Sequence, residues 1–367
     1  MTFEQFLRSA ALTGAPRECD REWAGGAVDL SRTAGIEITR ALYGEAEARG
    51  LSLSELLELD DYDPSPAGAP LDAFERQLAL AGIRFGGKTP TTVEQFYQQA
   101  PALLPEFMRR EIRAGQAMRP ELRRLIANTA IIASNTYTPF FIDTTDAACF
   151  SLRPVAEGAE TPQVLVTEQN HAVRIADYGL ALKASYKALR YRTASQFRIL
   201  LWYIGFRLQT DKIGMLVETI LNGDGNDNAA AVITSAASGV LAYDDLVNLW
   251  SQFAPFEMNT IICGVNLMKE ILTLDEFKDP MAGYRFQNTG DLFSPLGASL
   301  VRCDELAADL IVGLDSRFAI EEVVTQPLTI EYDKIIEQRF EEAVISESVA
   351  YAKVIHGAAV VLDTVHA

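Results

Sequence analysis

One long amphipathic pattern dominates the middle of the chain. Between residues 194 and 221 apolar side chains recur at spacings of three and four, which predicts a single α-helix about 40 Å long. Thr193 or Ser195 can cap its start, and Asn-Gly at residues 222–223 ends it. The apolar stripe of this helix comprises Phe197, Leu200, Leu201, Ile204, Leu208, Ile213, Leu216, Val217 and Ile220.

Two glycines, Gly205 and Gly214, lie inside this helical pattern. Glycine in a helix interior is less favourable than alanine by about 1 kcal/mol. We therefore expect other elements to approach the helix backbone closely at these two positions.

Shorter helical patterns precede the long helix and are separated by segments rich in turn residues. One helix is expected to begin at Asp29 or Ser31 and to end at Arg49, because Gly50 stands where a glycine commonly terminates a helix. Segments 60–66 and 84–90 break the helical pattern. The remaining helices of this region are expected at residues 52–59 (with Ser52 or Ser54 as the cap), at residues 71–81, and as two or three helices over residues 92–128.

The pattern changes after Tyr137, and Thr, Val, Ile and Phe become frequent over residues 140–179. Long strands are expected near residues 149–155 and 171–178, with a strand or turn near residues 164–167. Together they form an extended β-hairpin whose polar residues leave little apolar surface to bury. An isolated two-stranded arm is marginally stable in water, so we expect this hairpin to lie on a neighbouring subunit.

Helical and strand patterns alternate after the long helix, which is typical of an α+β fold with mixed sheets. Asp315 or Ser316 is a candidate cap for a helix running to Val323, and residues 335–362 fit either strands or a helix. The other expected helices cover residues 243–253 and 265–272, and the expected strands cover residues 259–263, 299–303, 309–314 and 328–332.

Composition narrows the class of protein. Hydrophobic residues make up 49% of the 367 residues, which is enough for a substantial core, and the formal net charge is −18. No cluster of Lys and Arg indicates a groove that reads nucleic-acid sequence. The four cysteines are too far apart for a CxxC motif and are expected to be free thiols in a reducing compartment. We expect neither a signal peptide nor a membrane span, and therefore no membrane partner.

Three features resemble chemical sites but lack essential parts. Residues 222–228 partly match a calcium-binding loop, yet its twelfth position would be Ser235 instead of glutamate. His171 has no serine or cysteine in a nucleophile-elbow motif nearby. The adjacent pairs Glu321-Glu322 and Glu341-Glu342 do not face each other on a helix or strand, so neither predicts a catalytic dyad. We expect no cofactor, no metal and no enzymatic activity.

Four short segments carry a family resemblance through their order and spacing. They are residues 176–185 (ADYGLALKAS), 190–196 (RYRTASQ), 221–225 (LNGDG) and 313–320 (GLDSRFAI). In this order they resemble the return strand of a hairpin, the start of a long helix, the turn ending that helix and a late segment of the major capsid proteins of tailed bacteriophages. The resemblance covers about two-thirds of the chain and implies the Hong Kong 97-type fold, which is α+β.

The resemblance implies a five-part organisation. Residues 1–136 would be a helical N-terminal arm or extension, and residues 137–185 the β-hairpin called the E-loop. Residues 186–227 would form the peripheral domain with its spine helix, residues 228–325 the axial domain, and residues 326–367 a segment returning to the peripheral domain.

The same resemblance implies a self-assembling subunit. Copies of the chain would form pentamers and hexamers of an icosahedral shell that encloses double-stranded DNA without sequence-specific recognition. The resemblance also implies portal and scaffold proteins, and a cement protein, as further partners. The chain would reside in the virion capsid after assembly in the host cytoplasm. The charged residues expected at inter-subunit contacts are Arg153, Glu157, Glu160, Glu168 and Arg174.

Some capsid proteins of this family join subunits by an isopeptide bond from a lysine in the E-loop. Here no lysine occurs between Lys88 and Lys183, so the predicted hairpin lacks the nucleophile and we expect no such cross-link. Two alternatives stay open. An encapsulin, a protein compartment of the same fold, would hold a protein cargo instead of DNA. A soluble α+β enzyme would need a pocket with convergent polar groups.

Overall fold

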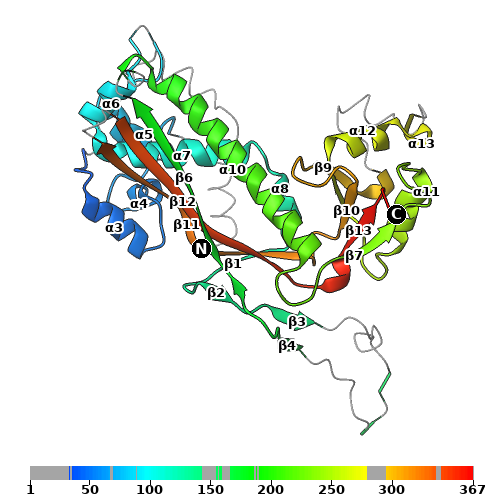
Figure 1. Ribbon diagram of the computed structural model, residues 1–367. Coiled ribbons are helices and arrows are strands. Elements are labelled where there is room, and N and C mark those ends of the chain that lie inside the picture. The colour runs from blue at the N-terminus through cyan, green and yellow to red at the C-terminus, as the bar shows by residue number, and fades with distance from the viewer. Residues whose placement is uncertain are drawn as a thin grey trace. The chain divides into compact units, whose positions relative to one another are not determined.

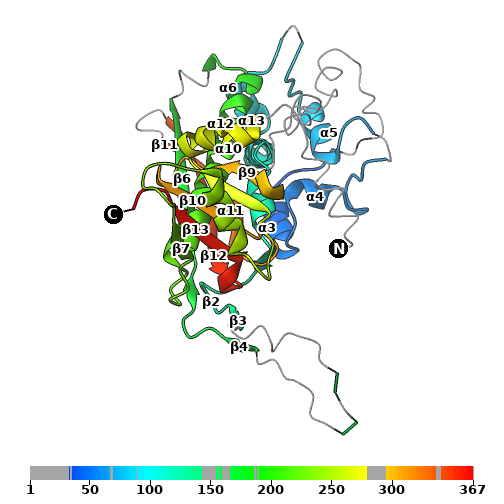
Figure 2. The same ribbon diagram turned by 90° about the vertical axis from the view of Figure 1, so that its right-hand side faces the viewer.

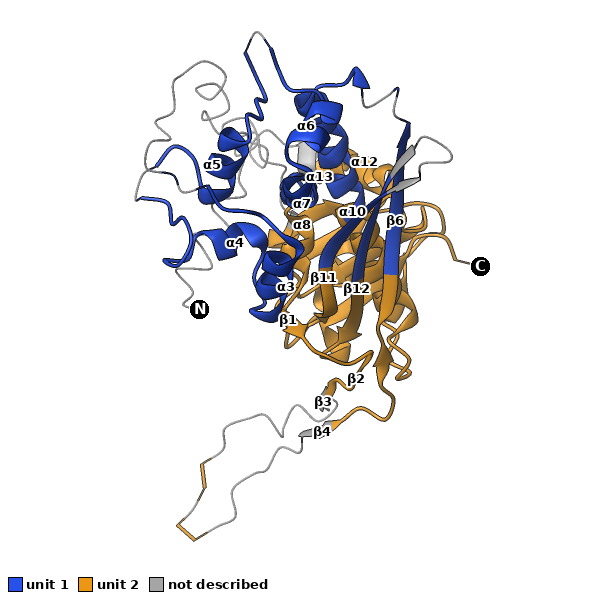
Figure 3. Cartoon of the chain, turned by 90° about the vertical axis from the view of Figure 1, so that its left-hand side faces the viewer, with its two compact units in different colours: residues 1–119, 178–208, 328–347 blue, residues 120–177, 209–327, 348–367 orange. Residues whose placement is uncertain are grey.

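The computed structural model describes residues 33–366 except 34, 67–68, 88, 143–153, 156, 159–165, 186, 188–189, 279–294 and 336–339 (Figure 1). The chain divides into two compact units (Figure 3). Unit 1 comprises residues 1–119, 178–208 and 328–347, and unit 2 comprises residues 120–177, 209–327 and 348–367. These boundaries do not test the five-part organisation expected from the sequence, which stays a prediction.

Unit 1 begins with a series of short helices, many of which start at a capping residue. Ser52 and Asp72 each accept a hydrogen bond from the backbone N–H three residues later, and the glutamate at that position accepts one in return. Gly50 follows the first helix at φ +66°, as expected of a terminating glycine. The elements are α3 (Arg40–Ala48), α4 (Leu53–Leu57), α5 (Ala73–Leu80), α6 (Val93–Gln99), the 3₁₀ turn η1 (Pro101–Leu103) and α7 (Leu104–Ala117).

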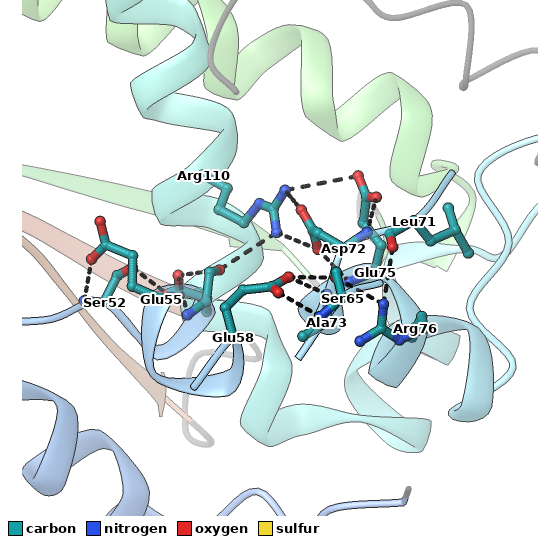
Figure 4. A network of polar contacts seen from close by, with 12 residues as sticks. Ser52, Glu55, Glu58, Ser65, Leu71, Asp72, Ala73, Glu75, Arg76 and Arg110 are labelled. Carbon is teal, nitrogen blue, oxygen red and sulfur yellow. Dashed lines mark hydrogen bonds and ion pairs between the residues drawn. The ribbon is translucent and has the colours of Figure 1, made fainter. Parts of the chain in front are cut away.

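A dense polar network joins these helices (Figure 4). Arg110 on α7 donates two hydrogen bonds, of 3.0 and 2.5 Å, to the two carboxylate oxygens of Asp72 at the start of α5. Glu58 accepts hydrogen bonds from the backbone N–H groups of Ser65 and Ala73, at 2.8 and 2.7 Å. Glu58, which follows α4, therefore connects the end of the turn-rich segment 60–66 with the start of α5.

The long helix α10 (Ala194–Asn222) confirms the strongest sequence prediction. Thr193, not Ser195, accepts the capping hydrogen bond, from the Gln196 N–H at 3.2 Å. Within unit 1, a Cβ on Gly205 would lie 2.0 Å from the carbonyl oxygen of Ile112 on α7, so two helix backbones do meet there. Within unit 2, Gly214 is approached by the carboxylate of Glu305 instead of by backbone.

Two larger sheets complete the fold. One has the strand order β1-β11-β12-β6 and the other the order β7-β13-β10-β8-β9. The strands of the first are β1 (Asn128–Ile131), β11 (Ile320–Ile335), β12 (Phe340–Lys353) and β6 (Ala176–Ser185). Those of the second are β7 (Ala231–Thr234), β13 (Ala359–Asp363), β10 (Leu310–Leu314), β8 (Thr260–Cys263) and β9 (Ser299–Arg302).

The five-stranded sheet lies wholly in unit 2, and its three central strands β13, β10 and β8 are buried on both faces. One face packs against α11 (Tyr243–Ser251) and α12 (Val265–Thr273), and Figure 2 shows both helices together with the strands of this sheet. The other packs against the second half of α10 and α8 (Glu121–Leu125). Neighbouring residues such as Val360 and Val361 therefore enter different cores. Burial on both faces explains why the three central strands have continuous apolar sequences.

The structure corrects several sequence predictions. Residues 315–319 form a turn that leads into β11, so the helix expected to run to Val323 is wrong. The strands β1 and β7 were not predicted, and residues 335–362, where described, form strands and a short 3₁₀ turn, η5 (His356–Ala358). Short further elements are α13 (Asp275–Lys278) and η3 (Pro295–Gly297). None of the helices in the described part of the chain combines the length and hydropathy needed to cross a bilayer.

Candidate functional site

The predicted β-hairpin leaves unit 2 as two short ladders. Strand β2 (Thr136–Tyr137) pairs antiparallel with β5 (Val173–Arg174), and β3 (Phe140–Ile142) pairs antiparallel with β4 (Val166–Glu168). Figure 1 shows these strands below the rest of unit 2. Phe140 on the outer ladder has 61% of its surface exposed. A two-stranded ladder with an exposed phenylalanine buries too little apolar surface to be stable by itself.

The residues predicted for inter-subunit contacts fall partly on these ladders. Glu168 and Arg174 are exposed on β4 and β5, and Glu157 is exposed in a turn. Arg153 and Glu160 lie outside the described residues, as does most of the strand expected at residues 149–155. The structure therefore confirms only that three of the five charged side chains are accessible, and their contact role stays a prediction.

The base of the hairpin is fixed to β11 by hydrogen bonds to Glu321. The Tyr137 hydroxyl and the Asn128 side-chain amide both donate to the Glu321 carboxylate, each at 2.6 Å. Partial burial and the adjacent Glu321 carboxylate raise the pKa of Tyr137 to about 12. The Thr325 hydroxyl, four residues further along β11, donates to the Ser134 carbonyl at 2.8 Å. These bonds make the hairpin base a rigid support for an exposed arm.

The turn that ends α10 forms a second support, built around a buried lysine. The Lys353 side chain is 1% exposed, and its ammonium donates to the backbone carbonyl of Asn228. Burial lowers the pKa of Lys353 to about 8, although the nearby Asp224 carboxylate acts in the opposite direction. Asn226 in the same turn accepts a hydrogen bond from the backbone N–H of His171, at 2.9 Å. The turn thus links α10, the last residue of β12 and the hairpin.

The polar side chains of the turn that resembles a calcium loop in sequence make hydrogen bonds within the protein. One oxygen of Asp224 accepts from the Asn226 side-chain amide at 2.9 Å, and the other accepts from the Lys353 backbone N–H at 2.9 Å. The side-chain oxygen of Asn228 accepts from the Asp224 backbone N–H at 3.0 Å. The side-chain oxygens of Asp224 and Asn228 therefore stabilise the turn itself. No group of three or more potential metal ligands occurs among the described residues.

The segment Gly313–Ile320 of the family resemblance is a structural turn held by Asp315. The Asp315 side chain is fully buried and accepts hydrogen bonds from the Glu257 N–H, at 3.1 Å, and from the Arg317 guanidinium, at 2.9 and 2.8 Å. Arg317 also pairs with Glu257 at 2.9 Å. The aspartate that resembles a helix cap in the sequence instead joins this turn to the segment before β8.

An apolar stripe on α10 is a feature that the sequence pattern concealed. In unit 1, Ile199, Leu200, Tyr203 and Phe206 are 63, 41, 61 and 37% exposed, and their spacing places them on one face of the helix. Leu200 belongs to the apolar stripe predicted from the sequence, yet it is not buried. Ile199, Tyr203 and Phe206 lie outside the apolar stripe predicted from the sequence, and these additional large apolar residues were the signal of a second apolar face.

Comparisons with known proteins agree on the fold. No protein-family model and no curated protein matches the sequence. Among solved structures, a virus-like particle from Pyrococcus furiosus aligns with a TM-score of 0.50 at 14% identity, covering 71% of this chain and 99% of that chain. The capsid of an empty GTA particle aligns with a TM-score of 0.49 at 14% identity, covering 66% and 89% of the two chains. An encapsulin complex from Synechococcus elongatus aligns with a TM-score of 0.45 at 14% identity, covering 67% and 88%.

The α+β chain described here therefore has the Hong Kong 97-type capsid fold, as the sequence resemblance predicted. Almost the whole chain of the virus-like particle subunit is matched by 71% of this one. The remainder of this chain is additional to that shared fold.

Proposed function

We propose that this protein is a shell subunit that self-assembles through pentamers and hexamers into an icosahedral particle. The observation that carries the proposal is a capsid fold bearing a two-stranded arm whose Phe140 is exposed and has no core of its own. An arm of this kind gains stability only when it lies on another surface. The exposed apolar stripe on α10 supports the same conclusion, because monomeric proteins rarely leave several large apolar side chains together in solvent.

We further propose that the particle is the head of a tailed phage, assembled in the host cytoplasm, and that it encloses double-stranded DNA. The net charge of −18 suits a wall that contacts packaged DNA without sequence-specific adhesion. Portal and scaffold proteins, and a cement protein, would then be further partners, and the chain would have no catalytic role.

The encapsulin alternative has one specific observation in its favour, since an encapsulin is among the aligned structures. The enzyme alternative needs a pocket with convergent polar groups. One cavity in unit 1 does not have this character, because it is lined by apolar side chains and Tyr332: Val93, Leu104, Met108, Leu182, Ala184, Phe197 and Ala343.

Electron microscopy of the purified chain, with absorbance at 260 and 280 nm on the same fraction, tests these proposals. Closed icosahedral particles support a shell subunit, and nucleic acid inside native particles supports a phage head. A protein cargo without nucleic acid would instead indicate an encapsulin. A monodisperse small oligomer across salt and protein concentrations would contradict the shell function.

The variant Phe140→Ser tests the arm directly. Because Phe140 is exposed in the single chain, this substitution should leave the melting temperature within about 2 °C of wild type, since surface changes alter stability by about 0.5 kcal/mol. It should nevertheless reduce particle yield several-fold, whereas Phe140→Tyr should retain assembly. Equal particle yield from wild type and Phe140→Ser would contradict the proposal that Phe140 on the arm contacts another subunit.

A further inference from the structure

Strand β7 lies at one edge of the five-stranded sheet in unit 2. It pairs parallel with β13, with Ala231 opposite Val360 and Thr234 opposite Asp363. Figure 1 shows β7 beside β13. An edge strand offers one row of backbone N–H and C=O groups to any strand that can lie beside it.

The outward-facing groups of β7 can be assigned from the ladder. The Ser235 N–H, directly after β7, donates to the Asp363 carbonyl at 2.9 Å, so it points toward β13. Backbone N–H groups alternate in direction along a strand. The N–H groups of Ile233 and Ala231 therefore also point toward β13, and those of Val232 and Thr234 point away from it.

Strand β7 and the segments that flank it carry no charged side chain that would protect this edge. No Asp, Glu, Lys or Arg occurs from residue 228 to residue 243, although charged residues make up 22% of the chain. The opposite edge of the same sheet is different, because Arg302 on β9 pairs with Asp304 at 2.7 Å and both side chains are exposed. Charged side chains and prolines are the usual means by which proteins keep sheet edges from pairing with other chains.

Exposed valines surround the edge. Val232 on β7 is 61% exposed, and Val240 and Val365 are 59 and 54% exposed. The Gly239 N–H donates to the Thr364 carbonyl at 2.7 Å, which brings the segments that carry Val240 and Val365 together beyond the end of β13. The result is a small apolar rim next to an open row of backbone hydrogen-bonding groups.

We propose that the β7 edge is an interface between copies of this chain, in which a second copy lies along β7 and pairs with the backbone of Val232 and Thr234. This inference rests on the proposed shell function. The charge of the chain argues for a second copy as the occupant. Each copy carries a net charge of −18, so two copies repel unless they meet where charge is absent or complementary. Strand β7 offers a surface to which its own segment contributes no charge.

Hydrogen–deuterium exchange of unassembled subunits and assembled particles tests the interface without any substitution. Exchange in peptides covering residues 231–235 should slow at least tenfold on assembly, because the outward N–H groups gain partners. Amides of the interior strand β10 serve as the control, since they are already bonded on both sides. Unchanged exchange at Val232 and Thr234 in closed particles would overturn the inference while leaving the shell function intact.

Matched charge substitutions test the same edge. Val232→Glu should reduce the yield of closed particles at least tenfold, while Val265→Glu, at a 47% exposed valine on α12, should assemble as wild type. Val232→Thr, which adds no charge, should also assemble. Normal assembly of Val232→Glu would overturn the inference. A wild-type chain that forms no particles under any condition would instead contradict the proposed function itself. If circular dichroism shows that Val232→Glu does not fold, the hydrogen–deuterium exchange of the wild-type chain decides whether the β7 edge is an interface.

Discussion

The ammonium of Lys353 donates a hydrogen bond to the backbone carbonyl of Asn228, and this contact closes the turn that ends α10. The same turn holds the hairpin through Asn226 and the backbone of β12 through Asp224. A buried cation thus takes the central position of a loop that in sequence resembles a metal site. Its role is to hold three segments of unit 2 together.

Stability should depend on the protonation of Lys353. Its pKa is about 8 in the folded chain and about 10.4 when unfolded, so between these values the unfolded chain binds more protons. Rising pH therefore favours the folded state in this window, by up to roughly 3 kcal/mol. In Lys353→Met this contribution should be absent.

Urea denaturation of wild type and Lys353→Met at pH 7 and pH 10 measures the effect. Other groups that titrate in this range, including tyrosines, affect both proteins equally. The difference in unfolding free energy between wild type and Lys353→Met therefore reports on Lys353 alone. A difference in unfolding free energy that is the same at both pH values would show that the pKa of Lys353 is not lowered by burial.

The contact between α7 and α10 should tolerate no side chain at its glycines. A Cβ on Gly115 would lie 2.2 Å from the Trp202 carbonyl oxygen, and one on Gly205 would lie 2.0 Å from that of Ile112. Either change to alanine should destabilise the protein by about 1–3 kcal/mol or more, because two backbones would have to separate. Gly44→Ala in α3 is the control. Nothing lies within 4 Å of that position, so it should stabilise by about 0.5–1 kcal/mol. Thermal denaturation in which all three variants shift the same way would contradict this account.

Much of the fold could be predicted because local signals agree with tertiary structure. The capping residues Ser52, Asp72 and Thr193 mark helix starts, and the apolar run before Gly264 marks β8. The helix expected after Asp315 was wrong, because that aspartate bonds to Arg317 and to a distant backbone N–H instead of to its own helix. The Glu257 N–H lies 58 residues away in the chain, and a partner at that distance cannot be recognised in the local sequence.

The candidate site was less predictable for a related reason. The hydrogen bond from His171 to Asn226 joins residues 55 positions apart, and the sequence around neither residue predicts it. Strand β7 has only four residues (AVIT) and is flanked by alanines and small polar residues, so no alternation of apolar and polar positions is evident. Edges and turns acquire their roles from partners distant in the chain, while helices acquire theirs locally.

Asp72 should serve both as a helix cap and as an anchor for Arg110. Its carboxylate accepts from the Glu75 backbone N–H at 2.8 Å and from the Arg110 guanidinium at 3.0 and 2.5 Å. Asp72→Ser retains capping but loses the ion pair, whereas Asp72→Ala loses both. We expect Asp72→Ser to cost about 1–3 kcal/mol and Asp72→Ala about 1 kcal/mol more. Urea denaturation separates the two contributions, and equal stability of Asp72→Ser and wild type would show that the pairing with Arg110 contributes nothing.

The turn at Asp315 should make unit 2 sensitive to acid. Burial alone raises the pKa of Asp315, but hydrogen bonds from Arg317 and from the Glu257 N–H outweigh it and hold the pKa below its usual value. A depressed folded pKa means that the contribution of this carboxylate is fully present above the unfolded pKa of about 3.9 and is lost as pH falls through the folded pKa.

Asp315→Asn should therefore lower the unfolding free energy at pH 7 by about 1–3 kcal/mol, because the donors around a buried acceptor lose their charged partner. The difference from wild type should shrink as pH falls below 4. Asp304→Asn is the matched control, since Asp304 pairs with Arg302 on the exposed surface and should contribute little at any pH. Denaturation midpoints at pH 7 and pH 3 measure both variants. A destabilisation by Asp315→Asn that persists undiminished at pH 3 would mean that the carboxylate charge is not what holds this turn.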